Sequence, residues 1–204
     1  MTTLRHDFVY LASQSPRRRQ LLDQIGVRHE LLLPDADEDA EALEAERHGE
    51  LPADYVRRVT LAKLHAARAR LTRRGLVPAP ILCSDTTVAL GTRILGKPRD
   101  RAEAIATLTL LSGRTHRVIT AVAIGSGRRE ALAANTSHVR IAPMNPADIE
   151  RYVDSGEPFG KAGAYAIQSA IAGWVERIDG SYSGIMGLPL FETATLLKQA
   201  GVRF

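Results

Sequence analysis

The strongest constraint on the fold is a pair of long segments, residues 115–125 and 130–141, which are rich in β-branched and small apolar side chains. The short polar connection through Ser126-Gly127 is typical of a β-hairpin. Because the two strands of a hairpin run antiparallel, any sheet that contains them is at least partly antiparallel. We therefore expect a fold that is built on a sheet.

Helical and extended segments alternate along the rest of the chain. Apolar side chains that recur every three or four residues over residues 52–75 predict a long amphipathic helix. Ser15-Pro16 and Asn145-Pro146 each place a capping residue before a proline, which is typical of a helix start. Further helices are expected over residues 101–111 and 188–199, and further strands over residues 8–12, 27–33, 81–83, 87–90 and 174–178.

This mixture predicts an α/β fold of mixed α+β character, with a partly antiparallel sheet flanked by helices. No repeat or low-complexity linker divides the chain, so we expect a single domain over residues 1–204.

The composition argues against several classes of protein. No apolar run reaches the roughly 18 residues of a membrane span, so no membrane association is expected. The net charge is only +4 and aromatic residues make up 5%, which argues against a nucleic-acid partner. The single cysteine, Cys83, cannot form an internal disulfide and fits a reducing compartment, so we expect a cytoplasmic protein.

Residues 11–18 (LASQSPRR) form a candidate anion site. A predicted strand ends here and a helix begins, so free backbone amides and the positive end of the helix dipole gather beside Ser13 and Ser15. Arg17 and Arg18 follow in the first helical turn, where cations are unfavourable unless an anion compensates them. Their guanidinium groups suit phosphate oxygens. Solvated surface charge is the alternative interpretation.

Two acidic segments are candidate cation sites. Asp85 lies between two apolar half-strands, where a carboxylate can hold a metal or orient a water molecule. Capping of an ordinary turn is the alternative for Asp85. Four carboxylates gather within residues 35–39, and clustered carboxylates bind hard cations. A solvated acidic loop is the alternative there.

Lysine is rare in this chain, and its positions are informative. Only four of the 27 basic residues are lysines. Two of them, Lys97 and Lys161, lie in glycine-containing segments where a compact ammonium can approach phosphate. Residues 91–98 nearly match a phosphate-binding loop, but their last residue is proline where a hydroxyl is required, so only Lys97 is retained. Residues 160–168 combine two glycines with Gln168, whose amide both donates and accepts.

Together these segments resemble the Maf family of nucleotide pyrophosphatases over nearly the whole chain. Four motifs carry the resemblance: LASQSPRRRQLL at residues 11–22, SDTTV at 84–88 with GKP at 96–98, KAGAYAIQ at 161–168, and residues 180–190, which end in GLPL. The resemblance implies an elongated, twisted α/β fold with two lobes around a central cleft, usually as a homodimer. It also implies hydrolysis of a nucleoside triphosphate between its α- and β-phosphates with a divalent cation, Mg²⁺ or in its place Mn²⁺ or Co²⁺.

By position, the resemblance assigns roles to individual residues. Asp85 falls on the family's catalytic acidic residue and is expected to bind the metal together with Glu38, which falls on the family's acidic-loop glutamate. Lys63 is preceded by Ala62, where relatives often carry a charged residue. The substrate contacts are expected at Ser13, Arg17, Arg18, Lys63, Thr86, Lys97 and Gln168.

Three of these positions separate two substrate groups of the family. Arg17, Thr86 and Gln168 resemble the group that acts on dTTP and UTP, whereas the 7-methyl-GTP group carries an aromatic residue, Gln and Glu. A glutamine can accept from N3–H of uracil or thymine and donate to a neighbouring carbonyl, whereas a carboxylate can only accept. We therefore expect a dTTP/UTP pyrophosphatase with a house-cleaning role against non-canonical nucleotides. The alternatives are a preference for modified nucleotides and a nucleotide-binding regulator of cell division without significant turnover.

Overall fold

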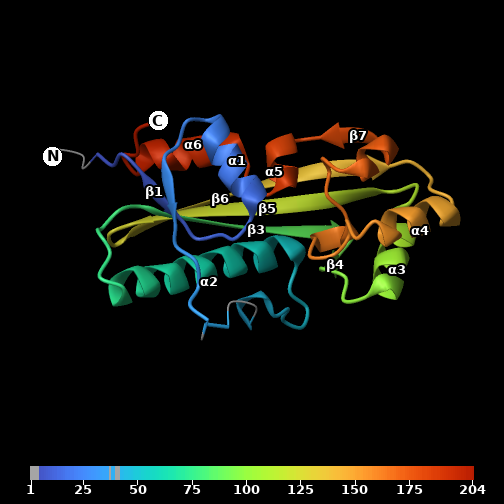
Figure 1. Cartoon of the computed structure of the whole chain (residues 1–204), viewed down its shortest axis with the longest axis horizontal. Helices are drawn as coiled ribbons and strands as arrows, with labels where there is room; N and C mark the ends of the chain where they lie inside the picture. The colour runs from blue at the N-terminus through green and yellow to red at the C-terminus, as the bar shows by residue number, and fades with distance from the viewer. Residues whose placement is uncertain (1–4, 37, 40–41) are drawn as a thin grey trace.

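The predicted hairpin forms the two longest strands of the sheet (Figure 1). The computed structural model describes residues 5–36, 38–39 and 42–204. Strands β5 (Thr115–Ser126) and β6 (Arg129–Ile141) pair antiparallel along their whole length. Gly127 makes the turn with a φ of 57°, in the left-handed region that favours glycine. The hairpin prediction is thus confirmed.

Within the described residues, seven strands form one mixed sheet in the order β2-β1-β3-β5-β6-β7, with β4 also paired to β3. β1 runs parallel to both of its neighbours, and every other pairing is antiparallel. The sheet is therefore partly antiparallel, as expected. Its other strands are β1 (Val9–Leu11), β2 (His29–Leu31), β3 (Ile81–Leu90), β4 (Arg93–Leu95) and β7 (Val175–Asp179).

One edge of β3 is forked. β1 pairs with the start of β3, ending at Leu11 opposite Leu82, and β4 pairs with its end, beginning at Leu95 opposite Val88. Between these two pairings, no described strand covers residues 83–87 on that edge. The fork leaves room beside Asp85 for groups that come from other parts of the chain.

The expectation that residues 84–86 interrupt the strand is wrong. β3 runs without a break, because β5 pairs with it from Ile81 opposite Gly125 to Ala89 opposite Arg117. Backbone pairing with a long neighbour outweighs the low strand preference of the polar residues, since every backbone group on that edge gains a partner. Asp85 is therefore held on a strand and not in a turn.

Helices cover both faces of the sheet in the half of the molecule that holds the chain's N-terminus (Figure 1). Helix α2 (Pro52–Arg73) packs on one face, and α1 (Pro16–Gln24) and α6 (Leu190–Gln199) pack on the other. α1 begins at the predicted proline, and α2 and α6 fall within their predicted ranges. No described helix is long and apolar enough to cross a membrane.

Alternation along β3 decides which helix each of its side chains meets. Leu82 belongs to the core under α1 and α6, whereas Cys83 belongs to the core under α2. Because successive side chains of a strand point to opposite faces, Asp85 shares the α2 face and Thr86 shares the other.

A second lobe lies at the opposite end of the long strands (Figure 1). Helices α3 (Arg101–Leu111) and α4 (Pro146–Asp154) pack there on a core of their own, to which β4 and residues 162–171 also contribute. The Asn145 side chain caps α4 by accepting from the backbone amide of Asp148, as its sequence predicts. The structure is thus an elongated α/β fold with two lobes. The remaining short helices are η1 (Ala42–Glu44), η2 (Ala162–Ala164), η3 (Ala170–Trp174) and α5 (Tyr182–Met186).

Candidate active site

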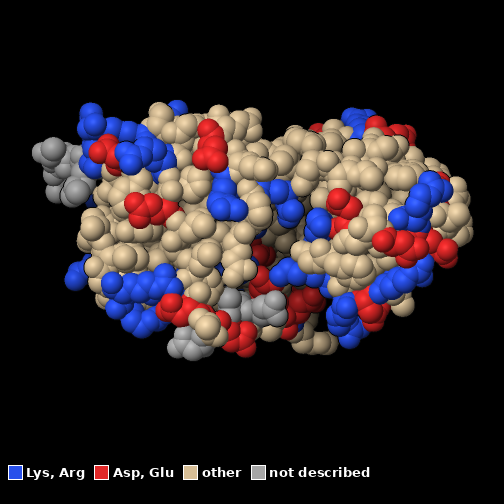
Figure 2. Space-filling model, viewed as in Figure 1, with Lys and Arg blue, Asp and Glu red and all other residues tan. Residues whose placement is uncertain are grey.

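A cavity of about 930 Å³ opens at the fork, lined by residues from both lobes. Figure 2 shows a hollow between the two halves of the molecule, with acidic and basic side chains along it. This volume suits a small-molecule ligand. Most residues that the sequence nominates line the cavity: Ser13, Arg17, Arg18, Glu38, Lys63, Asp85, Thr86 and Lys97.

Asp85 is the most enclosed acidic group of the cavity. Only 7% of the residue is exposed, and its Oδ1 accepts a hydrogen bond of 2.6 Å from Lys63 Nζ on α2. Burial raises the pKa of the Asp85 carboxyl, and the nearby Lys63 and Arg18 only partly offset this effect. Its Oδ2 has no hydrogen-bond partner among the described residues. The carboxylate therefore keeps one oxygen for a ligand or a proton.

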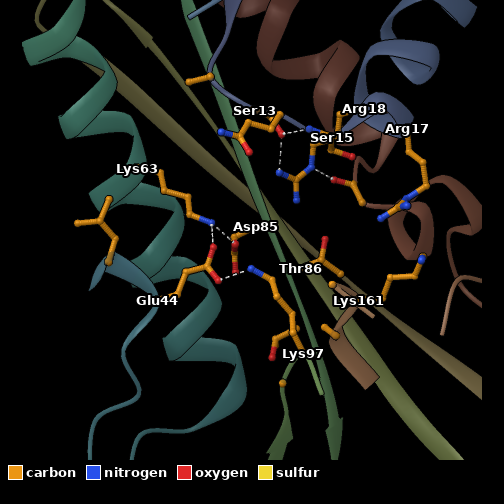
Figure 3. A pocket seen from close by; sticks show the side chains of 18 of the residues that line it. Ser13, Ser15, Arg17, Arg18, Glu44, Lys63, Asp85, Thr86, Lys97 and Lys161 are labelled. Carbon is orange, nitrogen blue, oxygen red and sulfur yellow. Dashed lines mark hydrogen bonds and ion pairs between the residues drawn. The ribbon is translucent and has the colours of Figure 1, made fainter. Parts of the chain in front are cut away.

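Glu44 is a member of the site that the sequence analysis does not identify. Its Oε1 accepts from the same Lys63 Nζ at 2.6 Å, and its Oε2 accepts from Lys97 Nζ at 2.8 Å (Figure 3). Burial raises the pKa of Glu44, but the two lysines outweigh it, so the net shift is downward. The Tyr55 hydroxyl on α2 donates to the Glu44 carbonyl at 2.9 Å and holds this segment over the cleft.

Arg18 faces Asp85 from the opposite side of the cleft (Figure 3). Its Nε donates to the Gly187 carbonyl at 2.8 Å, and its Nη1 donates to Ser13 Oγ at 3.0 Å. Burial lowers the pKa of this guanidinium, while Asp85 raises it; an arginine remains charged under such shifts. Two fixed bonds orient the fork, so Arg18 presents a preset cation to the cavity.

The start of α1 supplies further donors. Ser15 lies at the N-cap position, but its side chain makes no capping hydrogen bond, and the first turn holds no acidic residue. The free backbone amides of this turn therefore have no side-chain cap, and the turn lines the cavity. Arg17 and Lys161 extend into the same region from two different elements (Figure 3).

Thr86 lies on the other face of β3 from Asp85. Its hydroxyl is 3.0 Å from Thr120 Oγ1, which donates to the Gly184 carbonyl at 2.7 Å. Gly187 adopts a φ of 115°, and a Cβ added there would lie 3.6 Å from Thr86 Oγ1. The segment around α5 therefore packs close to the strand and places the carbonyl that orients Arg18.

Glu38 reaches the cavity wall, yet its carboxylate is engaged elsewhere. Arg70 donates to it through Nε at 3.0 Å and through Nη2, and Arg73 adds a further bond. These arginines lower the pKa of Glu38 to about 2, chiefly through the Arg70 hydrogen bonds. Asp37, from the same acidic segment, lies outside the described residues. No group of three or more metal-ligating side chains occurs in the described part of the chain.

Gln168 is exposed and is not among the residues that line the cavity. Its neighbours Tyr165 and Ile167 do line it. Tyr165 is anchored by His116, because its hydroxyl lies 2.7 Å from His116 Nε2. The structure thus places the segment at the cavity without bringing the Gln168 side chain into it.

The chain is similar to known proteins over nearly its full length. A family model described as Maf-like protein matches residues 8–200. A dTTP/UTP pyrophosphatase from Cupriavidus pinatubonensis is 63% identical over 98% of this chain and 100% of its own length. A dTTP/UTP pyrophosphatase from Polaromonas sp. is 62% identical over 97% of this chain and 98% of its own length.

Likeness to solved structures is weaker. A crystal structure of a nucleoside-triphosphatase, dITP/XTP pyrophosphatase, from Mycobacterium abscessus aligns with a TM-score of 0.41 and 17% identity. The alignment covers 67% of this chain and 75% of that chain. A likeness at this level bears on neither fold nor function.

Proposed function

The chain belongs to the Maf-like protein family, and from that premise we propose that its cleft hydrolyses dTTP and UTP to the nucleoside monophosphate and pyrophosphate. The observation that carries the proposal is the arrangement of Asp85, a buried carboxylate with a raised pKa, opposite the preset cation Arg18. Both lie in one cavity with Lys63 and Lys97.

The cations of the cleft suit a triphosphate. Five basic side chains from four separate parts of the chain line a common space: Arg17 and Arg18 of α1, Lys63 of α2, Lys97 and Lys161. A guanidinium that is fixed before the reaction, as Arg18 is, stabilises charge as it shifts to the leaving pyrophosphate, at little cost in reorganisation. The open amides at the start of α1 add donors for phosphate oxygens.

A divalent cation, Mg²⁺ in the first place, fits the donor set. Asp85 and Glu44 both direct a carboxylate oxygen at Lys63 Nζ, so the fold already gathers two hard ligands around a positive charge. Magnesium is commonly held by one or two carboxylates, with water and substrate phosphates completing its shell. When bound, the cation would neutralise phosphate charge in the transition state.

Asp85 is positioned to accept a proton. In its carboxylate form, Oδ2 takes a proton from a water molecule while the water oxygen attacks the α-phosphorus and the bond to the bridging oxygen of the β-phosphate breaks. The raised pKa of Asp85 makes this carboxylate a stronger base than an exposed one. General-base assistance of this kind typically contributes about 10²–10⁴-fold in rate.

The test is an assay of pyrophosphate release from a panel of nucleoside triphosphates, with and without Mg²⁺. Inorganic pyrophosphatase converts the product to phosphate for detection. We expect turnover of dTTP and UTP above the other nucleotides, and a loss of about 10²–10⁴-fold in kcat for Asp85→Asn. A folded Asp85→Asn variant with normal turnover would refute the role of Asp85. Nucleotide binding without product would favour a regulatory binding protein, and faster turnover of modified pyrimidine nucleotides would favour the alternative of a preference for modified nucleotides.

Base selectivity has its own test at Gln168. We propose that this side chain turns into the cleft and contacts the pyrimidine edge, as the family resemblance suggests. Gln168→Glu should then lower kcat/KM for UTP and dTTP by about tenfold, since an unpaired buried polar group costs roughly 1–3 kcal/mol. Its effect on GTP should be smaller. Equal effects on all nucleotides would exclude a contact with the base.

We further propose that the protein acts in the cytoplasm as a homodimer. The single, buried Cys83 suits a reducing compartment, and the dimer follows from the family resemblance. Light scattering of the purified protein measures the second point, and a mass of one chain at micromolar concentration would contradict it.

A further inference from the structure

Glu44, Lys63 and Asp85 form an ionic group in the cleft that we call the carboxylate–lysine bridge (Figure 3). Lys63 Nζ donates to Glu44 Oε1 and to Asp85 Oδ1, each at 2.6 Å. The side chains are 27%, 19% and 10% exposed in chain order. The bridge therefore gathers two carboxylates around one ammonium in a place that water reaches poorly.

Two carboxylates that both contact one ammonium are close enough to repel each other unless a cation lies between them. Lys63 supplies that cation. Lys97 also contacts Glu44, at 2.8 Å, but its side chain is 49% exposed and it makes no contact with Asp85. Among the described residues, Lys63 is the one cation that holds both carboxylates at once.

We propose that Lys63 is a placeholder for the divalent cation, and that Glu44 and Asp85 are the two carboxylates that receive the cation when Lys63 withdraws. The inference rests on the proposed hydrolysis. It assigns a role to Glu44 in preference to Glu38 as the partner of Asp85. Arg70 and Arg73 already occupy the carboxylate oxygens of Glu38, whereas those of Glu44 are held by lysines that phosphate can draw away.

The chemistry of lysine suits such an exchange. Its ammonium sits on a flexible four-carbon stem, so Nζ can leave the two carboxylates while α2 stays in place. An incoming triphosphate offers new anionic partners for Lys63 in the same cavity, which Arg18 and Lys97 also line. The released ammonium of Lys63 would contact phosphate, and Glu44 and Asp85 would hold a divalent cation, which carries two positive charges in place of one.

This exchange couples the two ligands. Without a triphosphate, the Lys63 ammonium has no phosphate to bind once it leaves the two carboxylates. The nucleotide-free protein should therefore bind the divalent cation weakly. With a triphosphate present, the cation should bind more tightly, and by reciprocity the nucleotide should bind more tightly with the cation. A non-hydrolysable α,β-methylene analogue of dTTP separates this binding effect from turnover.

Binding of Mn²⁺ to the nucleotide-free protein, followed by the electron paramagnetic resonance signal of free Mn²⁺, tests the proposal directly. Lys63→Met removes the ammonium and keeps an unbranched side chain, so it should bind Mn²⁺ about tenfold more tightly than the wild type. Glu44→Gln should bind it at least about tenfold more weakly, because a ligand oxygen is lost. Glu38→Gln is the matched control at another glutamate that lines the cavity and should leave the affinity within about twofold.

Two results would overturn the proposal: Lys63→Met that binds Mn²⁺ no better than the wild type, or Glu38→Gln that loses affinity while Glu44→Gln keeps it. Circular dichroism shows whether each variant is folded. Should Lys63→Met fail to fold, wild-type Lys63 can be followed by acetylation and mass spectrometry. Its reactivity should rise at least about twofold when Mn²⁺ and the analogue are added, and unchanged reactivity would equally reject the exchange.

The pyrophosphate-release assay keeps this inference separate from the proposed function. If the wild-type protein hydrolyses dTTP but Lys63→Met binds Mn²⁺ no more tightly than the wild type, the placeholder role of Lys63 is rejected and the proposed enzymatic function stands. If the variants show the expected Mn²⁺ affinities but the wild-type protein releases no pyrophosphate, the proposed enzymatic function is rejected and the cation site stands.

Discussion

Acidification from pH 7 to pH 5 should destabilise the fold through one buried side chain, His116 on β5. Only 2% of this residue is exposed, its Nε2 lies 2.7 Å from the Tyr165 hydroxyl, and its Nδ1 has no hydrogen-bond partner among the residues that the structure describes. The two rings meet edge to face with centroids 5.5 Å apart. Burial lowers the pKa of His116 to about 4, because a charged imidazole would lose its hydration there.

The sign and size of the effect follow from linkage. The imidazole has an ordinary pKa of 6.5 in the unfolded chain. Between pH 6.5 and 4, the His116 imidazole is therefore mostly protonated in the unfolded chain and mostly neutral in the folded chain. Stability is therefore complete above pH 6.5 and falls as the pH drops through this window. For these two pKa values, the free energy of unfolding should fall by about 2 kcal/mol between pH 7 and pH 5.

Urea unfolding at pH 7, 6 and 5 measures this loss, with His116→Gln as the matched variant. A glutamine amide can reach the position of Nε2 and still bond the Tyr165 hydroxyl, but it does not titrate. Carboxylates with a lowered pKa, such as Glu38, also lose their contribution on acidification, but mainly below pH 4.5 and equally in both proteins. The wild type should therefore lose about 2 kcal/mol more than His116→Gln between pH 7 and pH 5.

The same pH dependence in both proteins would contradict a lowered pKa of His116 in the folded chain. That result would mean that His116 is hydrated or paired well enough to hold its proton when folded. Activity provides a second comparison, because Tyr165 lines the cleft. His116→Phe removes the partner of the Tyr165 hydroxyl, so it should raise KM for dTTP more than His116→Gln does.

Three further changes test the site. Asp85→Asn should leave the urea-measured free energy of unfolding at pH 7 equal or higher, since it removes a carboxylate whose ionisation burial opposes; a clear loss would mean that the Lys63 pair is net stabilising. Arg18→Lys should raise KM for dTTP about tenfold or more with the fold intact by circular dichroism, because an ammonium cannot reproduce the fork held by Gly187 and Ser13. An unchanged KM would place Arg18 away from the phosphates. Gly187→Ala should cost about 1–3 kcal/mol in urea unfolding because of its φ of 115°, and no loss would show that the segment adjusts freely.

The parts of the fold that could be predicted are those with local signals. The β5–β6 hairpin depends on a turn and on the two segments that flank it, and α4 begins at Asn145-Pro146, as its capping pattern indicates. The continuity of β3 through Asp85 could not be predicted in the same way. It depends on pairing with β5, whose residues lie more than 25 positions further along the chain.

The same distinction between local signals and long-range contacts applies to the residues of the candidate site. Motifs nominated Arg18, Lys97 and Asp85, and the structure brings them to one cavity. Glu44 carries no such signal, because it lies in a stretch where many residues are acidic and nothing local distinguishes one from the next. Its place is decided by the Tyr55 bond to its carbonyl and by Lys63, which are contacts that only the folded chain creates.

The fork in the sheet explains why this site combines a fixed carboxylate with an exchangeable cation. Asp85 is carried by a strand that β5 pairs along nearly its whole length, so its backbone position is set before any ligand arrives. Across the open edge Asp85 faces Arg18 of α1, which two hydrogen bonds hold in place, and Lys63 of α2, whose long side chain can change contacts without movement of the sheet. A rigid base and a fixed guanidinium beside one exchangeable cation suit phosphoryl transfer, because the acceptor of the proton must stay aligned while charge moves from the α-phosphate to the leaving group.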